Sequence, residues 1–124
     1  MDLLNNLLFF LIAVAVLVSF HEFGHFIVAR WLGVRVLKFS IGFGKTILRW
    51  RRTPTGTEYA VGLIPLGGYV RMLDEREAKV SPSERDKAFN RKSLFTRSLI
   101  VLAGPAANLL LAILIYWSIG LIGN

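Results

Sequence analysis

Residues 7–32, LLFFLIAVAVLVSFHEFGHFIVARWL, decide the fold. The first fourteen are apolar except for Ser19, and apolar residues continue beyond the polar group at 21–25. A membrane-spanning helix needs about 20 predominantly apolar residues. A cleavable signal peptide is the alternative, but no Lys or Arg precedes the apolar run and Asp2 has the opposite charge. We therefore expect residues 1–33 to form a first transmembrane helix that stops at Gly33, since glycine often ends helices.

A second apolar block at 98–122 has no charged residue over 25 positions and predicts another transmembrane helix. All fifteen Lys and Arg lie from Arg30 to Arg97, and the net charge is +7. Because segments rich in Lys and Arg stay in the cytoplasm, we expect the middle of the chain there and both termini outside. A nucleic-acid site is the alternative for this charge, but the apolar flanks favour an anionic lipid surface. The lack of cysteine excludes disulfides and thiolate metal sites.

Between the two apolar blocks, residues 34–80 predict a small glycine-rich sheet. Runs rich in β-branched and aromatic residues alternate with glycine and proline turn signals. Residues 81–97 form a basic linker with an expected amphipathic helix at 83–92, close to the membrane surface. The fold class is a membrane α-helical protein with a small inserted antiparallel β-sheet. Its two transmembrane helices, the second at 98–122, flank a cytoplasmic or membrane-associated β region. The four expected strands are 34–40, 46–51, 57–64 and 69–73, with a hairpin loop at 52–56.

The polar group in the first span is His21-Glu22-Phe23-Gly24-His25. On a helix, residues four apart share a face, so His21 and His25 are able to bind one metal ion. Glu22 is then able to reach a metal-bound water as a general base, which is the logic of the H-E-x-x-H motif. Ionisable groups in a span cost several kcal/mol unless they are paired or solvated, which favours a metal or a polar cavity here. The alternative is that the three residues lie beyond the membrane edge.

Several stretches make the resemblance to a known family specific. They are FHEFGH at 20–25, FSIGFGK at 39–45, IPLGGYV at 64–70 and AGPAAN at 103–108. In this order they resemble the N-terminal part of the site-2 protease family of intramembrane zinc metalloproteases, in its bacterial RseP type. The resemblance implies a Zn²⁺ cofactor with His21 and His25 as ligands and Glu22 as the general base.

The family also has a membrane-associated β element that offers an edge to an unwound substrate, as strand addition requires. By this resemblance, the glycine segments of the sheet and the motif of the second helix are candidate substrate contacts. For a single glycine an ordinary turn is the alternative, and for the asparagine a structural hydrogen bond between helices. The candidate substrate-binding residues are Gly42, Gly44, Gly67, Gly68, Tyr69 and Asn108.

One departure from the family concerns the third zinc ligand, which in these enzymes is an aspartate on a later transmembrane segment. Leu73-Asp74-Glu75 matches a different family stretch and does not replace it. We therefore expect an N-terminal fragment of an intramembrane zinc metalloendopeptidase, inactive by itself, in the bacterial inner membrane. Its expected partners are the bilayer and a single-span membrane substrate such as an anti-sigma factor or a signal-peptide remnant, and not nucleic acid. The alternative is a non-catalytic membrane protein that binds a partner helix or anionic lipid.

Overall fold

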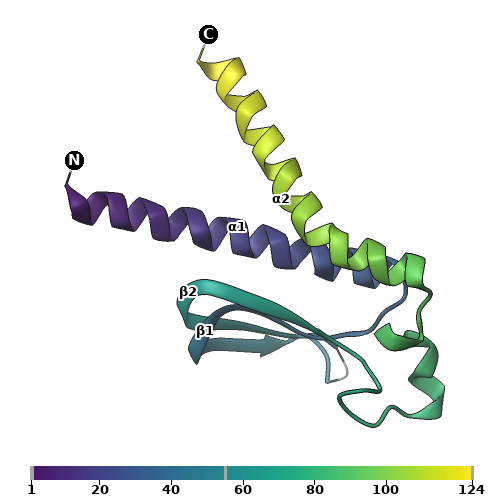
Figure 1. Cartoon of the computed structure of the whole chain (residues 1–124). Helices are drawn as coiled ribbons and strands as arrows, with labels where there is room; N and C mark the ends of the chain where they lie inside the picture. The colour runs from purple at the N-terminus through teal and green to yellow at the C-terminus, as the bar shows by residue number, and fades with distance from the viewer. Residues whose placement is uncertain (1, 55, 124) are drawn as a thin grey trace.

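The structure is a computed structural model that describes residues 2–54 and 56–123. Two long helices converge where the C-terminal part of one meets the N-terminal part of the other, and they diverge toward the chain ends (Figure 1). A bent sheet lies beside the first helix. The elements are α1 (Leu3–Trp31), β1 (Val36–Arg51), β2 (Glu58–Met72), the short 3₁₀ helices η1 (Pro82–Lys87) and η2 (Phe89–Arg91), and α2 (Leu94–Ile122).

Both long helices have the length and apolar composition of a membrane span. Each contains 29 residues, about 43 Å at 1.5 Å per residue, against a hydrocarbon core of about 30 Å. Asp2 caps α1 by accepting the N–H of Asn5 at 3.0 Å, and Ser93 caps α2 by accepting that of Thr96 at 3.2 Å. Because Ser93 sets its start, α2 begins one turn before the uncharged block at 98–122.

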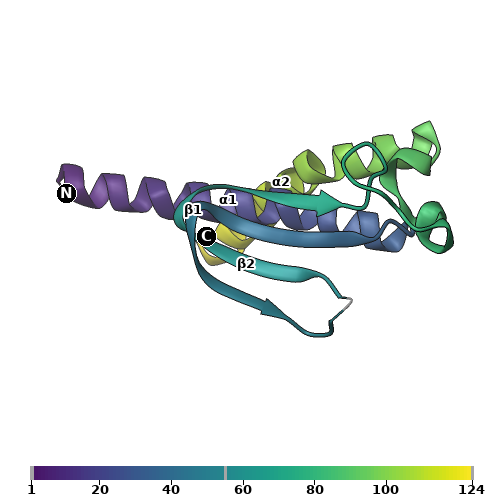
Figure 2. The ribbon, with the colours of Figure 1, turned by 90° about the horizontal axis from the view of Figure 1, so that it is seen from below.

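The predicted fold class is confirmed, with two apolar helices flanking a small sheet. We expected four separate strands, but the sheet has two continuous strands that each bend back (Figure 2). Residues 38–41 are central: they pair antiparallel with 68–71 and, running in the same direction, with 58–61. Residues 46–51 pair antiparallel with 58–62. Within the described ranges, the halves 68–72 and 46–51 thus form the two outer edges.

The bends of β1 and β2 meet at Gly42 and Gly62. A Cβ added to either residue would lie 2.7 Å from the carbonyl oxygen of the other. Gly42 also has a φ of 90° and Gly44 one of 78°, values that residues with a Cβ rarely adopt. The chain therefore reverses at these glycines without leaving the sheet, which explains why the predicted break between the first two strands is absent.

The buried core fixes the sheet to the last turns of α1. Phe26 packs edge-on against Phe39 of β1, with ring centroids 5.2 Å apart, and lies 6.0 Å from the ring of Tyr59 of β2. Ile100 of α2 closes this core and is almost fully buried. Because Phe26 directly follows His25, the packing that holds the sheet also positions it beside residues 21–25. The core residues are Phe26, Ala29, Val34, Val36, Phe39 and Ile100.

The basic linker before α2 does not form the amphipathic helix that we predicted at 83–92. Two 3₁₀ turns, η1 and η2, take its place. Their backbone groups bond to other segments instead of to a helical ladder. The N–H of Arg35 donates to the carbonyl of Lys87 at 3.0 Å, and the N–H of Phe89 donates to that of Leu73 at 2.7 Å. The linker is thereby tied to the end of the sheet where β1 begins and β2 ends.

Glu75, in the segment between β2 and the linker, holds the linker through several contacts. Its N–H donates to Oδ1 of Asn90 at 3.0 Å, and its carboxylate accepts from Nδ2 of Asn90 and from Nη2 of Arg91, both at 3.1 Å. The hydrogen bond from the Arg91 guanidinium holds the pKa of the Glu75 carboxyl below its usual 4.5, and the hydrogen bond from Asn90 acts in the same direction. The ion pair therefore favours the folded linker whenever the carboxyl is ionised.

Acid is expected to loosen this linker. A carboxyl with a lowered pKa in the folded state stabilises fully above pH 4.5, and this stabilisation is lost as the pH falls through the lowered pKa. Hydrogen exchange at the amides of Glu75 and Phe89, corrected for intrinsic rates, should become faster as the pH falls below 4.5. Glu75→Gln keeps the amide contact but not the titration, so the acid step at these amides should disappear. The same step in the variant would contradict the assignment to Glu75.

Candidate metal centre and its cavities

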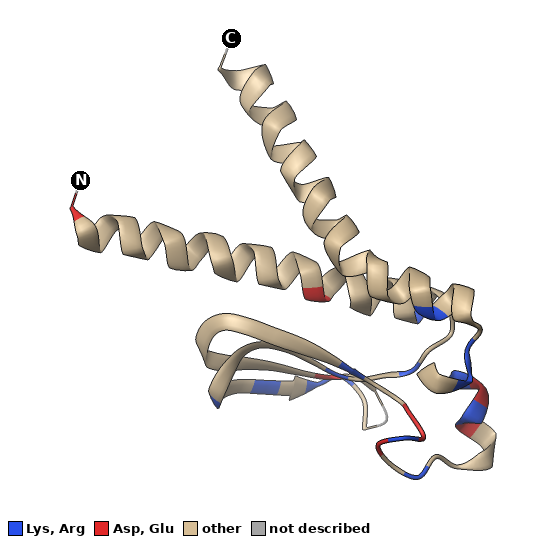
Figure 3. Ribbon diagram, in the orientation of Figure 1, with Lys and Arg blue, Asp and Glu red and all other residues tan. Residues whose placement is uncertain are grey.

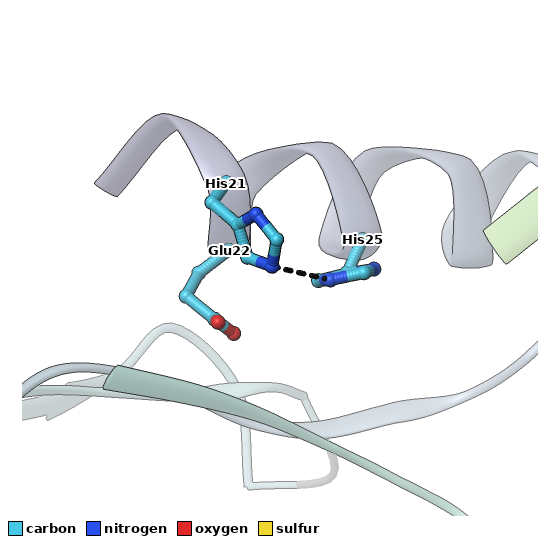
Figure 4. Close-up of side chains that lie close together, drawn as sticks. All are labelled: His21, Glu22 and His25. Carbon is cyan, nitrogen blue, oxygen red and sulfur yellow. Dashed lines mark hydrogen bonds between the residues drawn. The ribbon is translucent and has the colours of Figure 1, made fainter. Parts of the chain in front are cut away.

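His21, Glu22 and His25 gather on one side of α1, and the Glu22 carboxylate points toward the sheet (Figure 4). The two Nε2 atoms are 3.1 Å apart, and one ligand atom from each of the three residues lies within 4.8 Å of the others. Two nitrogens bound to one tetrahedral zinc at about 2.0–2.1 Å lie about 3.3 Å apart. The imidazoles therefore fit a single zinc ion, as their spacing on the helix predicts.

A carbonyl on α2 fixes the tautomer of His25. Nδ1 of His25 lies 2.7 Å from the carbonyl oxygen of Ile100. A carbonyl only accepts, so Nδ1 carries the proton and Nε2 presents its lone pair to the position shared with His21. Such a partner on the remote ring nitrogen is the usual way in which a metal-binding histidine is oriented. The centre thus involves both helices although all its side chains come from α1.

Small residues bring α2 against this part of α1. A Cβ added to Gly24 would lie 2.8 Å from Cβ of Ala107 and would overlap the carbonyl oxygen of Ala103. A Cβ added to Gly104 would lie 2.7 Å from Cε1 of His25 and 2.8 Å from Cε1 of His21. Gly24 thus admits the neighbouring helix, and Gly104 leaves room for both imidazoles.

Two cavities meet at Glu22 and Gly68. The larger, of 610 Å³, extends along the outer edge of β2 and also contacts His25. The smaller, of 350 Å³, lies on the side of Phe43 and contacts His21 and Asn108. A Cβ on Gly68 would be only 3.5 Å from Cγ of Glu22, so the edge of β2 lies directly beside the glutamate. The carboxylate is therefore positioned to reach a ligand in either cavity.

The structure divides the candidate substrate-binding residues into two groups. Gly68, Tyr69 and Asn108 are among those that line the two cavities, and Oδ1 of Asn108 is buried without a hydrogen-bond partner. Gly67 also lines the smaller cavity, and a Cβ there would overlap the ring of Phe43. Neither described cavity includes the remaining two residues, which belong to the bend of β1. These are Gly42 and Gly44.

Asp74 does not join the metal centre. Its Oδ2 atom lies 2.6 Å from Nη2 of Arg76, and this guanidinium holds the pKa of the Asp74 carboxyl below its usual value. Asp74 is one of the residues that line the larger cavity. Among residues 2–54 and 56–123, the group that is able to hold a metal ion comprises only His21, Glu22 and His25. The described residues thus provide two imidazoles and one carboxylate.

The model of peptidase family M50 matches residues 9–123, nearly the whole chain and with it the complete site. The chain belongs to peptidase family M50. This is the site-2 protease family that the sequence motifs resemble, so the predicted family is confirmed.

Curated relatives of this M50 chain are close in sequence but much longer. A protein of Xylella fastidiosa (strain Temecula1), whose name includes the words "zinc metalloprotease", is 57% identical over 99% of the chain and 28% of its own length. The regulator of sigma-E protease RseP is 56% identical in Salmonella typhimurium (strain 14028s) and 55% in Escherichia coli (strain K12), each over 99% of the chain and 27% of the relative. The M50 chain therefore spans little more than a quarter of the relatives that it matches.

Sequence reasoning missed two contacts of this M50 site. Every residue has a backbone carbonyl, so the residue type of Ile100 gives no signal for this contact. Its position four residues before Gly104 was the available signal. The ring of Phe43 lines the smaller cavity, and its position between two motif glycines was the available signal. Both contacts depend on segments far apart in sequence, which local patterns do not bring together.

Proposed function

We propose that this chain is the N-terminal part of an intramembrane zinc metalloendopeptidase that cleaves transmembrane proteins. The observation that carries the proposal is the pair of facing imidazoles with an adjacent carboxylate on an apolar helix, directly beside a sheet edge. Three ionisable groups within five residues of a span are costly unless a metal ion and a polar cavity compensate them. Family membership and the zinc metalloprotease name of a relative support the same activity.

In this proposal His21 and His25 hold zinc through Nε2, and the carbonyl of Ile100 keeps His25 oriented. Bound zinc lowers the pKa of a water ligand toward about 7 and polarises a carbonyl. Glu22 accepts the proton of the attacking water on a carboxylate oxygen and delivers it to the leaving amine. The cavities on both sides of Glu22 support this role, because a peptide crossing from one to the other passes its carboxylate.

We propose that the substrate binds as an extended strand along residues 68–72 of β2. A transmembrane helix satisfies its peptide groups internally and must unwind before one of them is hydrolysed. The outer edge of β2 borders the larger cavity, so it offers backbone groups to an added strand. Because Gly68 has no side chain, no group stands between its backbone and Glu22. Asn108, with its buried and unpartnered Oδ1, is the candidate acceptor on the opposite side.

The proposed location is the bacterial inner membrane, with the sheet and linker in the cytoplasm and both ends of the chain outside. The charge distribution supports this orientation: basic residues gather on the sheet and linker, whereas the long helices carry few (Figure 3). The names of the RseP relatives mention regulation of sigma-E, and an anti-sigma factor with one membrane span is the substrate class that we propose by this similarity.

We further propose that the third zinc ligand comes from residues beyond these 124. Catalytic zinc usually has three protein ligands, whereas the described residues supply two imidazoles and a glutamate that is needed as base. A cleavage assay on a single-span substrate should therefore show activity for the chain extended to the length of its relatives, and none for the 124 residues alone. Zinc content measured in parallel should be lower for the short chain. Equal cleavage by both chains would contradict the proposal that a third ligand lies beyond these residues. No cleavage by either chain would contradict the proposed protease activity.

A further inference from the structure

A third cavity, of 550 Å³, lies at the opposite end of the core from the metal centre. It is formed where the last turn of α1 meets the start of β1, the loop between β1 and β2, and the linker. It shares no lining residue with the two cavities beside Glu22. Its lining includes Arg30, Gly33, Val34, Arg35, Arg52 and Lys87.

The charged residues that line this cavity are all cationic. They are Arg30, Arg35, Arg52 and Lys87, and no Asp or Glu is among the lining residues. Nη1 of Arg35 lies 2.5 Å from Oε2 of Glu84, so that charge is compensated by a neighbour of the cavity. Over residues 2–54 and 56–123, no ion pair joins Arg30, Arg52 or Lys87 to a carboxylate. Three uncompensated positive charges from separate segments therefore face one space.

The cavity lies at the level where a membrane-spanning α1 would leave the hydrocarbon. Arg30 belongs to the last turn of α1, and its guanidinium lies 5.5 Å from the ring centre of Phe26, which orients it. The next residue, Trp31, is 75% exposed, as is typical of the aromatic residues found at headgroup level. The cavity therefore opens where lipid phosphates are concentrated.

We propose that this cavity binds the phosphate group of an anionic phospholipid. Guanidinium groups bind phosphate oxygens through paired N–H bonds, and Lys87 adds a point charge. The volume of 550 Å³ is that of an ordinary ligand site, which accommodates a glycerophosphate headgroup as well as the phosphate. A lipid is favoured over free phosphate because α1 holds the site at the membrane boundary. This inference does not depend on the proposed proteolysis.

The bound headgroup would connect three segments of the chain at this end of the core. Arg30 comes from α1, Arg52 from the loop beside the sheet and Lys87 from η1. Bridging them by one anion lowers their mutual repulsion and holds the sheet and the linker against the end of α1. The metal centre is on the other side of the same core, so the lipid acts on the position of the sheet rather than on the chemistry.

The test is a binding titration of the whole 124-residue chain in a neutral detergent, followed by native mass spectrometry. The probes are dioleoylphosphatidylglycerol, dioleoylphosphatidylcholine and inorganic phosphate. The cavity variant, Arg52→Gln/Lys87→Gln, removes two positive charges from the cavity and retains the contact of Arg30 with the ring of Phe26. The double variant Lys45→Gln/Lys79→Gln is the matched control. Both lysines are exposed and lie outside the cavity, and their replacement lowers the net charge by the same amount as the cavity variant does. Circular dichroism verifies that both variants remain folded.

The cavity variant should bind phosphatidylglycerol about 30-fold more weakly, since each cation near an anionic lipid contributes about 1 kcal/mol, and the control should change little. Phosphatidylcholine should bind weakly to all forms. Equal weakening in both variants would mean diffuse attraction and would overturn the site. Displacement of the lipid by millimolar inorganic phosphate would overturn the lipid as the source while keeping a phosphate site.

Discussion

Replacing Glu22 with glutamine should reduce substrate cleavage by the longer protein by about 10²–10⁴-fold, the usual contribution of a general acid–base group. Glutamine fills the same space beside Gly68 but accepts no proton at the pH of the reaction. The imidazoles should still bind zinc, since their Nε2 atoms and the Ile100 carbonyl are unchanged. Cleavage of a single-span substrate and zinc content are measured on the same preparation. Loss of cleavage with retained zinc is the expected pair of results.

Glu77→Gln is the matched control for this substitution. Glu77 lines the same 610 Å³ cavity, but its carboxylate is directed to Arg71 at 3.8 Å and does not belong to the metal-binding group. This variant should retain cleavage close to that of the parent. If Glu22→Gln cleaves as fast as Glu77→Gln, Glu22 is not the base and the proposed mechanism is wrong. Loss of zinc together with cleavage would assign Glu22 to the ligands instead.

Gly104→Ala should damage the metal centre through packing alone. The added methyl group would overlap the His25 ring and lie 2.8 Å from Cε1 of His21, so either the imidazoles turn away or α2 moves outward. Overpacking of this kind typically costs about 1–3 kcal/mol. We expect weaker zinc binding in equilibrium dialysis and a lower unfolding temperature in detergent.

Gly120→Ala supplies a control in the same helix with the opposite expected sign. A Cβ there meets nothing within 4 Å, so only the higher helix propensity of alanine acts, by up to about 1 kcal/mol. Its zinc binding should be unchanged and its unfolding temperature equal or higher. If Gly104→Ala binds zinc as well as Gly120→Ala does, the close approach of α2 to the imidazoles is wrong.

The parts of the site that depend on local spacing could be predicted from the sequence. His21 and His25 share a face because they are four residues apart, and Glu22 follows from the same motif. The four β-rich runs correspond to the four halves of the sheet. The glycine and proline signals at 41–44 and 65–68 indicated where the chain turns, but a local pattern does not show that Gly42 meets Gly62 or that each strand continues through its bend.

Long-range contacts account for what the sequence did not predict. The linker pattern favoured a helix, but its backbone groups bond to Arg35 and Leu73, which are remote in sequence. The sequence shows a glycine at position 24, but it does not show that α2 packs against it. The separation of Gly42 and Gly44 from the cavities likewise follows from the three-dimensional path of β1. Local propensity therefore located the chemistry, whereas tertiary packing decided its surroundings.

If the chain is the protease part that we propose, the narrow separation between Gly68 and Glu22 would affect how a substrate is selected. Even an added methyl group on Gly68 would touch the glutamate side chain, whereas an intact helix is about 10–12 Å wide with its side chains. An intact helix therefore does not fit between the sheet edge and α1, and we expect only an extended segment to bind along residues 68–72. The apparent affinity for a substrate is then its intrinsic affinity reduced by the fraction of molecules that are locally unwound. Two substrates with identical contacts to the protein would thus differ in cleavage rate according to the helical stability of the segment around the scissile bond.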